Sequence, residues 1–167
     1  YKINKEGTEN VVNMALSCKV EKLVHVSSVA TIGRDTKSSL ITENTKWERS
    51  EMVTHYAKSK YLAEMEAWRG AAEGLNVVVV NPSTILGSGF WHKGTSRFFE
   101  LAWHSFSWYS KGSTGFVDVR DVAQLMIKAM ETAESGERFI LSGENLPYKE
   151  LMTQISSQLN RPAANRK

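Results

Sequence analysis

Tyr56 and Lys60 form the residue pair whose types and spacing could do chemistry most directly. They lie four positions apart, so in a helix both side chains occupy one face. An ammonium group held near a phenol favours the phenolate, which allows the tyrosine to exchange a proton with a substrate near neutral pH. Alone, the pair is weak evidence, because a tyrosine four residues before a lysine is common and usually has no catalytic role.

Two adjacent hydroxyl groups, those of Ser27 and Ser28, follow the short apolar segment LVHV at residues 23–26. A hydroxyl at the carboxyl end of a strand is placed where open parallel sheets bind their ligands. Because side chains alternate along a strand, only one of two neighbouring serines can face such a site. The sequence therefore offers one serine as a possible partner of the Tyr–Lys pair.

Three short apolar segments predict the sheet that must position these side chains. They are continuous, rich in β-branched residues and bounded by Ser, Pro and Gly, as expected for strands buried on both faces of a parallel sheet. Helical spacing between them predicts helices, and a last helix is expected over about 148–159. The sequence thus indicates an α/β fold with a mostly parallel sheet. The three predicted strands lie at 23–26, 77–80 and 139–141.

The composition bounds the class of protein. The 167 residues, 41% hydrophobic and 23% charged, suit one ordinary globular domain with a hydrophobic core. The net charge of +3 includes no block of like charges, so we expect no nucleic-acid partner. The longest unbroken apolar stretch is Val77–Val80, too short for a membrane span. With Cys18 as the one cysteine and four histidines that do not cluster, no metal site is predicted, and a cytoplasmic location is expected.

Five motifs in a fixed order give the chain a resemblance to a known family. Together they resemble the extended short-chain dehydrogenase/reductase superfamily, also called the NAD-dependent epimerase/dehydratase family. The likeness is greatest to its dihydroflavonol-reductase-like and 3β-hydroxysteroid-dehydrogenase-like branch. Any one motif is weak, but all five in family order are specific. They are INKEGTENVV from Ile3, LVHVSSVATIG from Leu23, HYAKSKYLAE from His55, NVVVVNPSTILG from Asn76, and FVDVRDVA from Phe116 followed by GERFILSGENLPYKEL.

The resemblance implies a role for four residues in catalysis. Tyr56 matches the general acid/base, and Lys60 matches the lysine that holds the nicotinamide ribose and favours the phenolate. Ser28, the second of the two serines, matches the hydroxyl that hydrogen-bonds the substrate carbonyl. Asn4 matches an asparagine that supports the lysine through water in many relatives; its alternative interpretation is a polar residue that stabilises a helix.

The resemblance also implies a cofactor, NADP or NAD. Besides Tyr56 and Lys60, Ser27 is expected at the cofactor. So is the loop that follows the strand at 77–80, which in the family lies over the nicotinamide. That loop contains Asn81, Pro82, Ser83 and Thr84. A plain strand-ending turn, in which Pro82 ends the ladder, is compatible with this role.

The chain differs from a complete family member at its beginning. A complete member starts with a strand, a GxxGxxG turn and a helix that bind the pyrophosphate, and no such glycine motif occurs here. We therefore expect an incomplete Rossmann-like doubly wound parallel sheet with a small carboxyl-terminal substrate lobe. Residues 1–87 are expected to form the sheet half with the catalytic Ser, Tyr and Lys. Residues 88–167 are expected to form the lobe, interleaved with a late sheet strand near 137–142.

Two features of the predicted lobe bear on the substrate. Aromatic residues are frequent from Phe90 to Tyr109, and they could line a pocket for a flat or apolar molecule or form the core of the lobe. Sugar-nucleotide epimerases usually carry an arginine just before the segment that corresponds to Phe116–Val119, where this chain has Ser113, Thr114 and Gly115. Without that diphosphate clamp, a nucleotide-sugar substrate is disfavoured.

These observations predict an NAD(P)-dependent oxidoreductase that reduces a ketone or oxidises a secondary alcohol on a small uncharged or aromatic molecule. An epimerase or dehydratase on the same scaffold is the first alternative. The other two alternatives are a module that kept the fold without catalysis and a fragment that is inactive by itself. By analogy with the family, we expect a homodimer through the helices near 1–18 and 54–74.

Overall fold

A computed structural model describes residues 2–33, 41–45, 47 and 54–166 of the chain. The described chain divides into two compact units. The first comprises residues 1–82 and 123–141, and the second comprises residues 83–122 and 142–167.

The first unit is built on a parallel sheet of three strands in the order β1-β2-β5. Leu23 pairs with Val77 and Val79 pairs with Arg138, and both ladders are parallel. All three predicted strands are present, which confirms the parallel α/β fold. The elements are η1 (Lys2–Glu6), α1 (Gly7–Ser17), β1 (Leu23–Val26), η2 (Val29–Thr31), α2 (His55–Ala72), β2 (Val77–Pro82), α4 (Val119–Thr132) and β5 (Arg138–Leu141).

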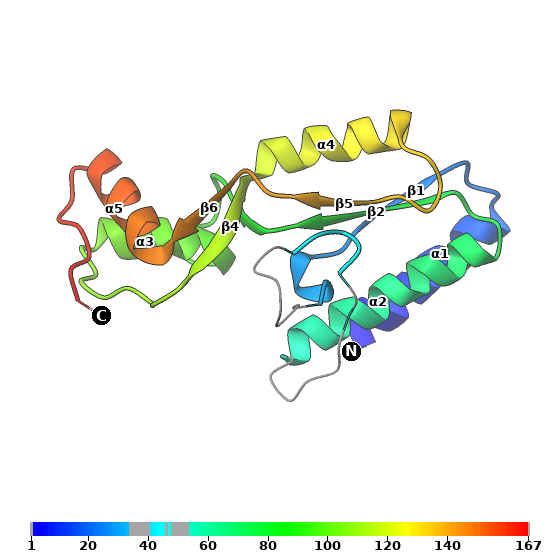
Figure 1. The fold of residues 1–167 in the computed structure, drawn as a ribbon, viewed down its shortest axis with the longest axis horizontal. Helices are drawn as coiled ribbons and strands as arrows, with labels where there is room; N and C mark the ends of the chain where they lie inside the picture. The colour runs from blue at the N-terminus through cyan, green and yellow to red at the C-terminus, as the bar shows by residue number, and fades with distance from the viewer. Residues whose placement is uncertain (1, 34–40, 46, 48–53, 167) are drawn as a thin grey trace. The chain divides into compact units, whose positions relative to one another are not determined.

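Helices cover both faces of this sheet, with α1 and α2 on one face and α4 on the other (Figure 1). The central strand β2 is buried along its whole length. Val77 and Val79 pack with Ala15 of α1 and Ala67 of α2 in one apolar cluster. Burial on two faces explains why β2 reads as an unbroken run of valines instead of an alternating pattern.

Small residues allow α1 and α2 to pack closely. Gly70 of α2 faces Val12 of α1, and a Cβ atom at position 70 would lie only 2.7 Å from Val12 Cγ1. Val12 itself is fully buried. The two helices that precede and follow β1 therefore form one closely packed layer; Tyr56 belongs to α2, and Asn4 lies in η1, directly before α1.

The second unit contains a smaller mixed sheet that the sequence did not predict. In the order β3-β4-β6, β3 runs parallel to β4 and β4 antiparallel to β6. Short strands without an apolar run give little sequence signal. The late strand expected near 137–142 is β5, and it belongs to the sheet of the first unit. The elements of the second unit are β3 (Thr84–Leu86), η3 (Gly94–Ser96), α3 (Arg97–Trp103), β4 (Ser113–Asp118), β6 (Glu144–Pro147) and α5 (Tyr148–Gln158).

Aromatic side chains hold the second unit together. Phe98 meets Phe116 at a ring-centroid distance of 6.5 Å and Tyr148 at 6.1 Å, and Phe116 contacts Tyr148 edge to face. Phe90, by contrast, is 82% exposed. Part of the aromatic segment is therefore core, whereas Phe90, Trp103 and other members present their rings to solvent.

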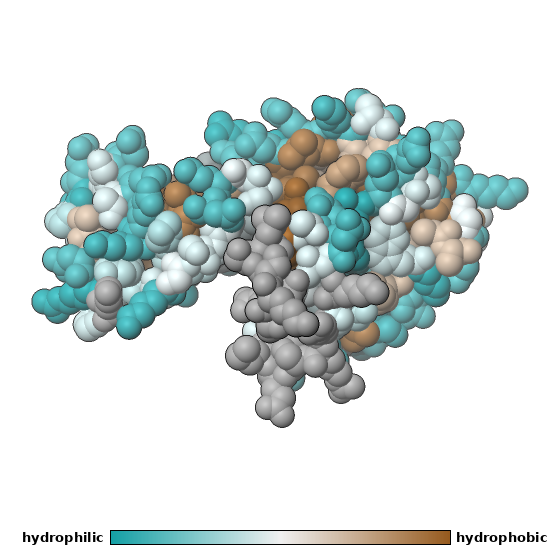
Figure 2. All heavy atoms as spheres, viewed as in Figure 1, coloured by the Kyte–Doolittle hydropathy of each residue, from teal (hydrophilic) through white to brown (hydrophobic). Residues whose placement is uncertain are grey.

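The visible surface is mostly hydrophilic, with hydrophobic residues gathered along α4 and the adjoining strands (Figure 2). Leu125, Ile127 and Met130 of α4 are among the exposed large apolar residues. Within the described ranges, we find no helix whose length and hydropathy would let it cross a membrane.

Candidate active site

Lys60 connects helix α2 to the carboxyl end of strand β1. Its Nζ atom donates a hydrogen bond of 2.8 Å to the carbonyl oxygen of Val26, the last residue of β1. Burial lowers the pKa of Lys60 below its ordinary value, and the nearby Glu64 carboxylate opposes that change. The ammonium group therefore lies at the end of the sheet where parallel α/β folds bind ligands.

Tyr56 lies in the first turn of α2, one turn before Lys60. Thr54 caps this helix, since its Oγ1 accepts a hydrogen bond of 3.1 Å from the backbone N–H of Ala57. The Tyr56 side chain is 57% exposed, so its phenol is open to a ligand. The i, i+4 spacing predicted for Tyr56 and Lys60 is confirmed, because both belong to one uninterrupted helix.

The two serines after β1 have different surroundings. Ser27 is buried, and its hydroxyl donates a 2.5 Å hydrogen bond to Oε2 of Glu64. Ser28 caps η2 by accepting a hydrogen bond from the Ala30 N–H. Ser28 is half-buried, and no hydrogen bond donated by its hydroxyl is found among the described residues.

Asn4 is positioned against α2 beside the Tyr–Lys pair. Its Nδ2 donates a 2.9 Å hydrogen bond to Ser59 Oγ, and Ser59 in turn donates to the carbonyl oxygen of Tyr56. Asn4 belongs to η1, a π-helical turn, and such turns are frequent at functional sites. The Asn4 side chain thus contacts Ser59, the residue next to Lys60.

The four residues after the valines of β2 divide between the two units. Asn81 and Pro82 end β2, whereas Ser83 and Thr84 begin the second unit. Asn81 is fully buried, and its Nδ2 donates to the carbonyl oxygen of Ser28 at 3.1 Å. Asn81 Oδ1 and Ser83 Oγ are buried oxygen atoms that lack a hydrogen-bond partner among the described residues.

Glu64 was missed by the sequence analysis and is the centre of a buried polar network. Its side chain is fully buried, one helical turn after Lys60. Burial alone raises the pKa of a carboxyl group, but hydrogen bonds from Ser27 and Thr31 and the charge of Arg138 outweigh it and hold the pKa of Glu64 below its ordinary value. A glutamate among the small apolar residues Ala57, Ala63 and Ala67 of the same helix was the sequence feature that could have indicated this buried network.

His25 lies in β1 near this network. Burial first, and then the positive charge of Lys60, lower the pKa of His25 from 6.5 to about 4, while Glu64 acts in the opposite direction. The imidazole is therefore neutral at pH 7. Three His, Cys, Asp or Glu side chains that could hold a metal ion do not come together anywhere in the described ranges.

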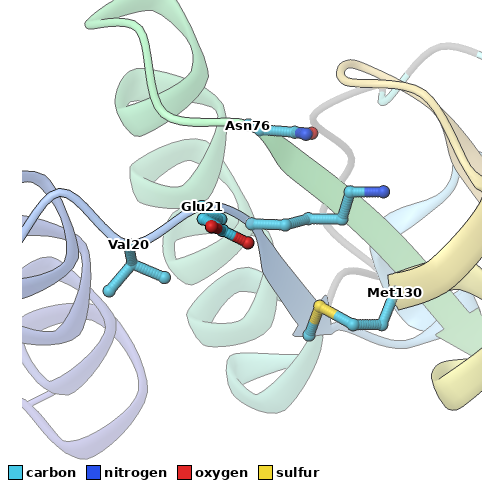
Figure 3. Close-up of a pocket in the computed structure, with 5 residues that line it drawn as sticks. Val20, Glu21, Asn76 and Met130 are labelled. Carbon is cyan, nitrogen blue, oxygen red and sulfur yellow. The ribbon is translucent and has the colours of Figure 1, made fainter.

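An open hollow of about 540 Å³ lies at the opposite end of the sheet (Figure 3). Val20, Glu21 and Asn76 line it together with Lys22 and Met130, and these residues precede the starts of β1 and β2 or lie on α4. Ligands of open parallel sheets bind at the carboxyl ends of the strands. This hollow is therefore at the opposite end of the sheet from Lys60 Nζ and Ser28.

Comparison with known proteins identifies the family. Residues 1–142 match the model of the NAD dependent epimerase/dehydratase family. The chain belongs to this family, which confirms the resemblance drawn from its five motifs.

Curated relatives and a solved structure give the same result. A Synechocystis protein named for dihydroflavonol 4-reductase is 30% identical over 98% of this chain and 49% of its own length. Tetraketide alpha-pyrone reductase 2 of Arabidopsis thaliana is 30% identical over 96% of this chain and 54% of its own length. The crystal structure of gox2253 superposes with a TM-score of 0.91 at 31% identity, over 99% of this chain and 51% of that one.

The chain spans about half the length of the relatives that it matches. Reductases are prominent among those relatives, as expected from the resemblance to the dihydroflavonol-reductase-like branch. The described strands correspond to an incomplete Rossmann-like sheet, and the matching structures confirm that fold.

Proposed function

We propose that this chain carries the proton-transfer and carbonyl-binding residues of an NAD(P)-dependent oxidoreductase. The reaction is reduction of a ketone, or oxidation of a secondary alcohol, on a small uncharged or aromatic molecule. The observation that carries the proposal is the hydrogen bond from Lys60 to Val26. It fixes the Tyr56 helix to the end of β1, which is followed by Ser27 and Ser28.

Each residue of the motif has one task in the proposed reaction. The Ser28 hydroxyl donates a hydrogen bond to the substrate carbonyl oxygen and polarises the carbonyl group. Tyr56 passes its phenolic proton to that oxygen as the carbonyl carbon is reduced, and Lys60 stabilises the phenolate that remains. When bound, the nicotinamide cofactor supplies the hydride. In the reverse direction, the Tyr56 phenolate would take the hydroxyl proton of the alcohol, and an oxidised nicotinamide cofactor, when bound, would accept the hydride from its carbon.

The polar groups at the end of β2 suit a nicotinamide cofactor. A nicotinamide carries a carboxamide whose N–H groups are donors, and Asn81 Oδ1 and Ser83 Oγ are buried acceptors that lack a partner in the described part of the chain. Lys60 has two further protons for ribose hydroxyls. Pro82 and Thr84 would complete this edge of the site. Ser27, whose hydroxyl is engaged by Glu64, would contribute its backbone.

The rest of the cofactor site is proposed to come from an amino-terminal half of the kind that the relatives contain. The unpaired edge of β1 is the place where such a half would extend the sheet, since β1 is an edge strand in the described sheet. Exposed apolar residues of η1 and α1, among them Ile3, Val11 and Met14, support a further contact surface there, and we include a homodimer through α1 and α2 in the proposal.

Replacing Tyr56 with Phe in the full-length gene product tests the assignment. Removal of the phenolic proton should lower kcat about 100- to 10,000-fold. Because the side chain is half exposed, the melting temperature should change little. Tyr61→Phe is the matched control, since it removes a hydroxyl from the same helix and keeps the ring that stacks on Trp47. Full activity in the Tyr56 variant would rule out the proposed role.

Titration with NADPH and NADH, followed by quenching of tryptophan fluorescence, tests the shared cofactor site. Saturable micromolar binding is expected for the full-length gene product and not for the 167-residue chain alone. Micromolar binding by the chain alone would mean that the residues described here form a complete cofactor site.

A second candidate function is an epimerase or dehydratase, which the family match supports. Net cofactor oxidation with an added ketone favours the reductase, whereas turnover without net cofactor change favours the epimerase. The packing of Gly115 counts against a nucleotide-sugar clamp, because a Cβ atom there would lie 2.5 Å from Ser142 Oγ and 3.0 Å from Ser83 Cβ.

A further inference from the structure

We infer that Glu64 is a positioning residue that holds Ser28 in place for the carbonyl group of the substrate. The inference rests on the proposed function, because it assigns Glu64 a part in that same reaction. It concerns a side chain that is fully buried and cannot itself touch a ligand.

Five donors converge on the two carboxylate oxygens of Glu64. Oε2 accepts hydrogen bonds from Ser27 Oγ at 2.5 Å, Thr31 Oγ1 at 2.6 Å and Asn81 Nδ2 at 3.0 Å. Oε1 accepts from Trp68 Nε1 at 3.2 Å and forms a short ion pair with Arg138. An ionised carboxylate has about four lone-pair sites and no donor, so it suits a ring of donors that no neutral side chain of this size can match.

Three of those donors surround Ser28. Ser27 precedes it in the chain, and the backbone N–H of Thr31 donates to the Ser28 carbonyl oxygen at 3.0 Å. The Thr31 hydroxyl, whose single proton is shared with Glu64 Oε2, lies 2.8 Å from the same carbonyl oxygen. Asn81 Nδ2 bridges the same carbonyl oxygen and the Glu64 carboxylate. The backbone of Ser28 is therefore fixed by groups that are themselves fixed by Glu64.

The network attaches Ser28 to the helix that carries the other reacting groups. Tyr56, Lys60 and Glu64 follow one another at four-residue spacing on α2, so they share one face of the helix. Lys60 holds Val26 and Glu64 holds Ser27, which both precede Ser28, and Glu64 also holds Thr31, which follows it. The Ser28 segment is thus held on both sides by side chains of the helix that also carries Tyr56.

A double-mutant cycle in the full-length gene product tests this inference. In Glu64→Gln, an amide N–H faces some of the donors that Glu64 accepts from, so the Ser28 segment should shift. A displacement of about 1 Å should lower kcat about 10- to 100-fold. If Glu64 acts through Ser28, the same substitution in a Ser28→Ala background should lower kcat less than about threefold. The Kd for NADPH should change less than about threefold. An equal loss in both backgrounds would overturn the inference.

Two further variants keep the test decisive. Glu73→Gln removes one carboxylate from the exposed end of α2, where it pairs with Arg69, and should leave kcat within about twofold. If Glu64→Gln does not fold, Thr31→Val removes one donor with little change in shape. It should lower kcat about 3- to 10-fold, and this loss should disappear in the Ser28→Ala background. Additive losses would again contradict the inference.

Amide hydrogen exchange in the cofactor-free chain gives a readout that does not depend on activity. In Glu64→Gln, the amides of Thr31 and Ile32, which bond to Ser28 and Val29, should exchange at least about tenfold faster. The Val79 amide, bonded to Glu137 in the same unit, is the internal reference and should be unchanged. Equal acceleration at all three amides, or none, would show that Glu64 does not position this segment. A wild-type protein that reduces no carbonyl compound would refute the proposed function and leave this exchange test valid.

Discussion

The two units of the molecule are stabilised by different kinds of side-chain contact. The first unit packs aliphatic strands around a buried charged network, with Glu64 and Arg138 paired beneath Asn81. The second unit packs aromatic rings, with Phe98, Phe116 and Tyr148 in mutual contact.

The difference shows what each unit can provide to a reaction. Hydrogen bonds to a buried carboxylate are directional, so they fix the serine segment to a narrow set of positions. Aromatic contacts depend mainly on buried area and tolerate a range of ring orientations. The first unit therefore restricts its polar side chains more narrowly than the second unit restricts its rings.

The largest expected effect comes from Phe116→Ala. This side chain is 5% exposed, so the cavity should destabilise the second unit by about 3–5 kcal/mol. If the units are separately ordered, amide exchange should accelerate in α5 and β6 while the Val79 amide of β2 stays protected. Equal acceleration in both units would contradict the comparison.

An intermediate effect is expected from Gly70→Ala, which tests the packing of α1 on α2. The new methyl group would meet Val12, and the overpacking should lower the free energy of unfolding by about 1–3 kcal/mol. Gly7→Ala is the matched control, because a Cβ atom at position 7 meets no atom within 4 Å. Urea denaturation followed by circular dichroism measures both variants. A Gly70 variant as stable as the control would mean that this contact can relax.

The smallest expected effect is a pH dependence that arises in the first unit. The pKa of His25 is lowered to about 4, so below pH 6.5 the unfolded chain binds a proton that the folded chain excludes. The stabilisation is complete above pH 6.5 and is lost as the pH falls toward 4. Between pH 7.5 and 5.5 the unfolding free energy should fall by about 1.4 kcal/mol more in wild type than in His25→Gln. Parallel pH profiles for the two proteins would contradict this assignment.

The sequence was sufficient to predict the parallel sheet and the helix that carries the Tyr–Lys pair. Uninterrupted valines in β2 and the four-residue spacing of Tyr56 and Lys60 are local patterns with one main physical interpretation. The resemblance then gave Ser28, Asn4 and Asn81 their expected roles, which stay predictions.

The sequence was not sufficient to predict the Glu64 network or the second sheet. Arg138 is far from Glu64 in the chain, and only the pairing of β5 with β2 brings the two together. Strands such as β6, with the sequence ENLP, have no alternating or apolar pattern and are specified by their neighbours. Long-range pairing, which local patterns do not encode, accounts for both omissions.

The strand order β1-β2-β5 also has a consequence for the synthesis of the protein. The central strand β2 is made long before β5, because residues 83–122 of the second unit lie between them. Parallel pairing between distant segments forms slowly, and the valines of β2 stay without one neighbour until Leu141 has left the ribosome. During that interval the nascent chain exposes an unpaired strand edge that can aggregate. We therefore expect the yield of folded protein in cells to depend on chaperones and on the rate of translation through residues 83–141.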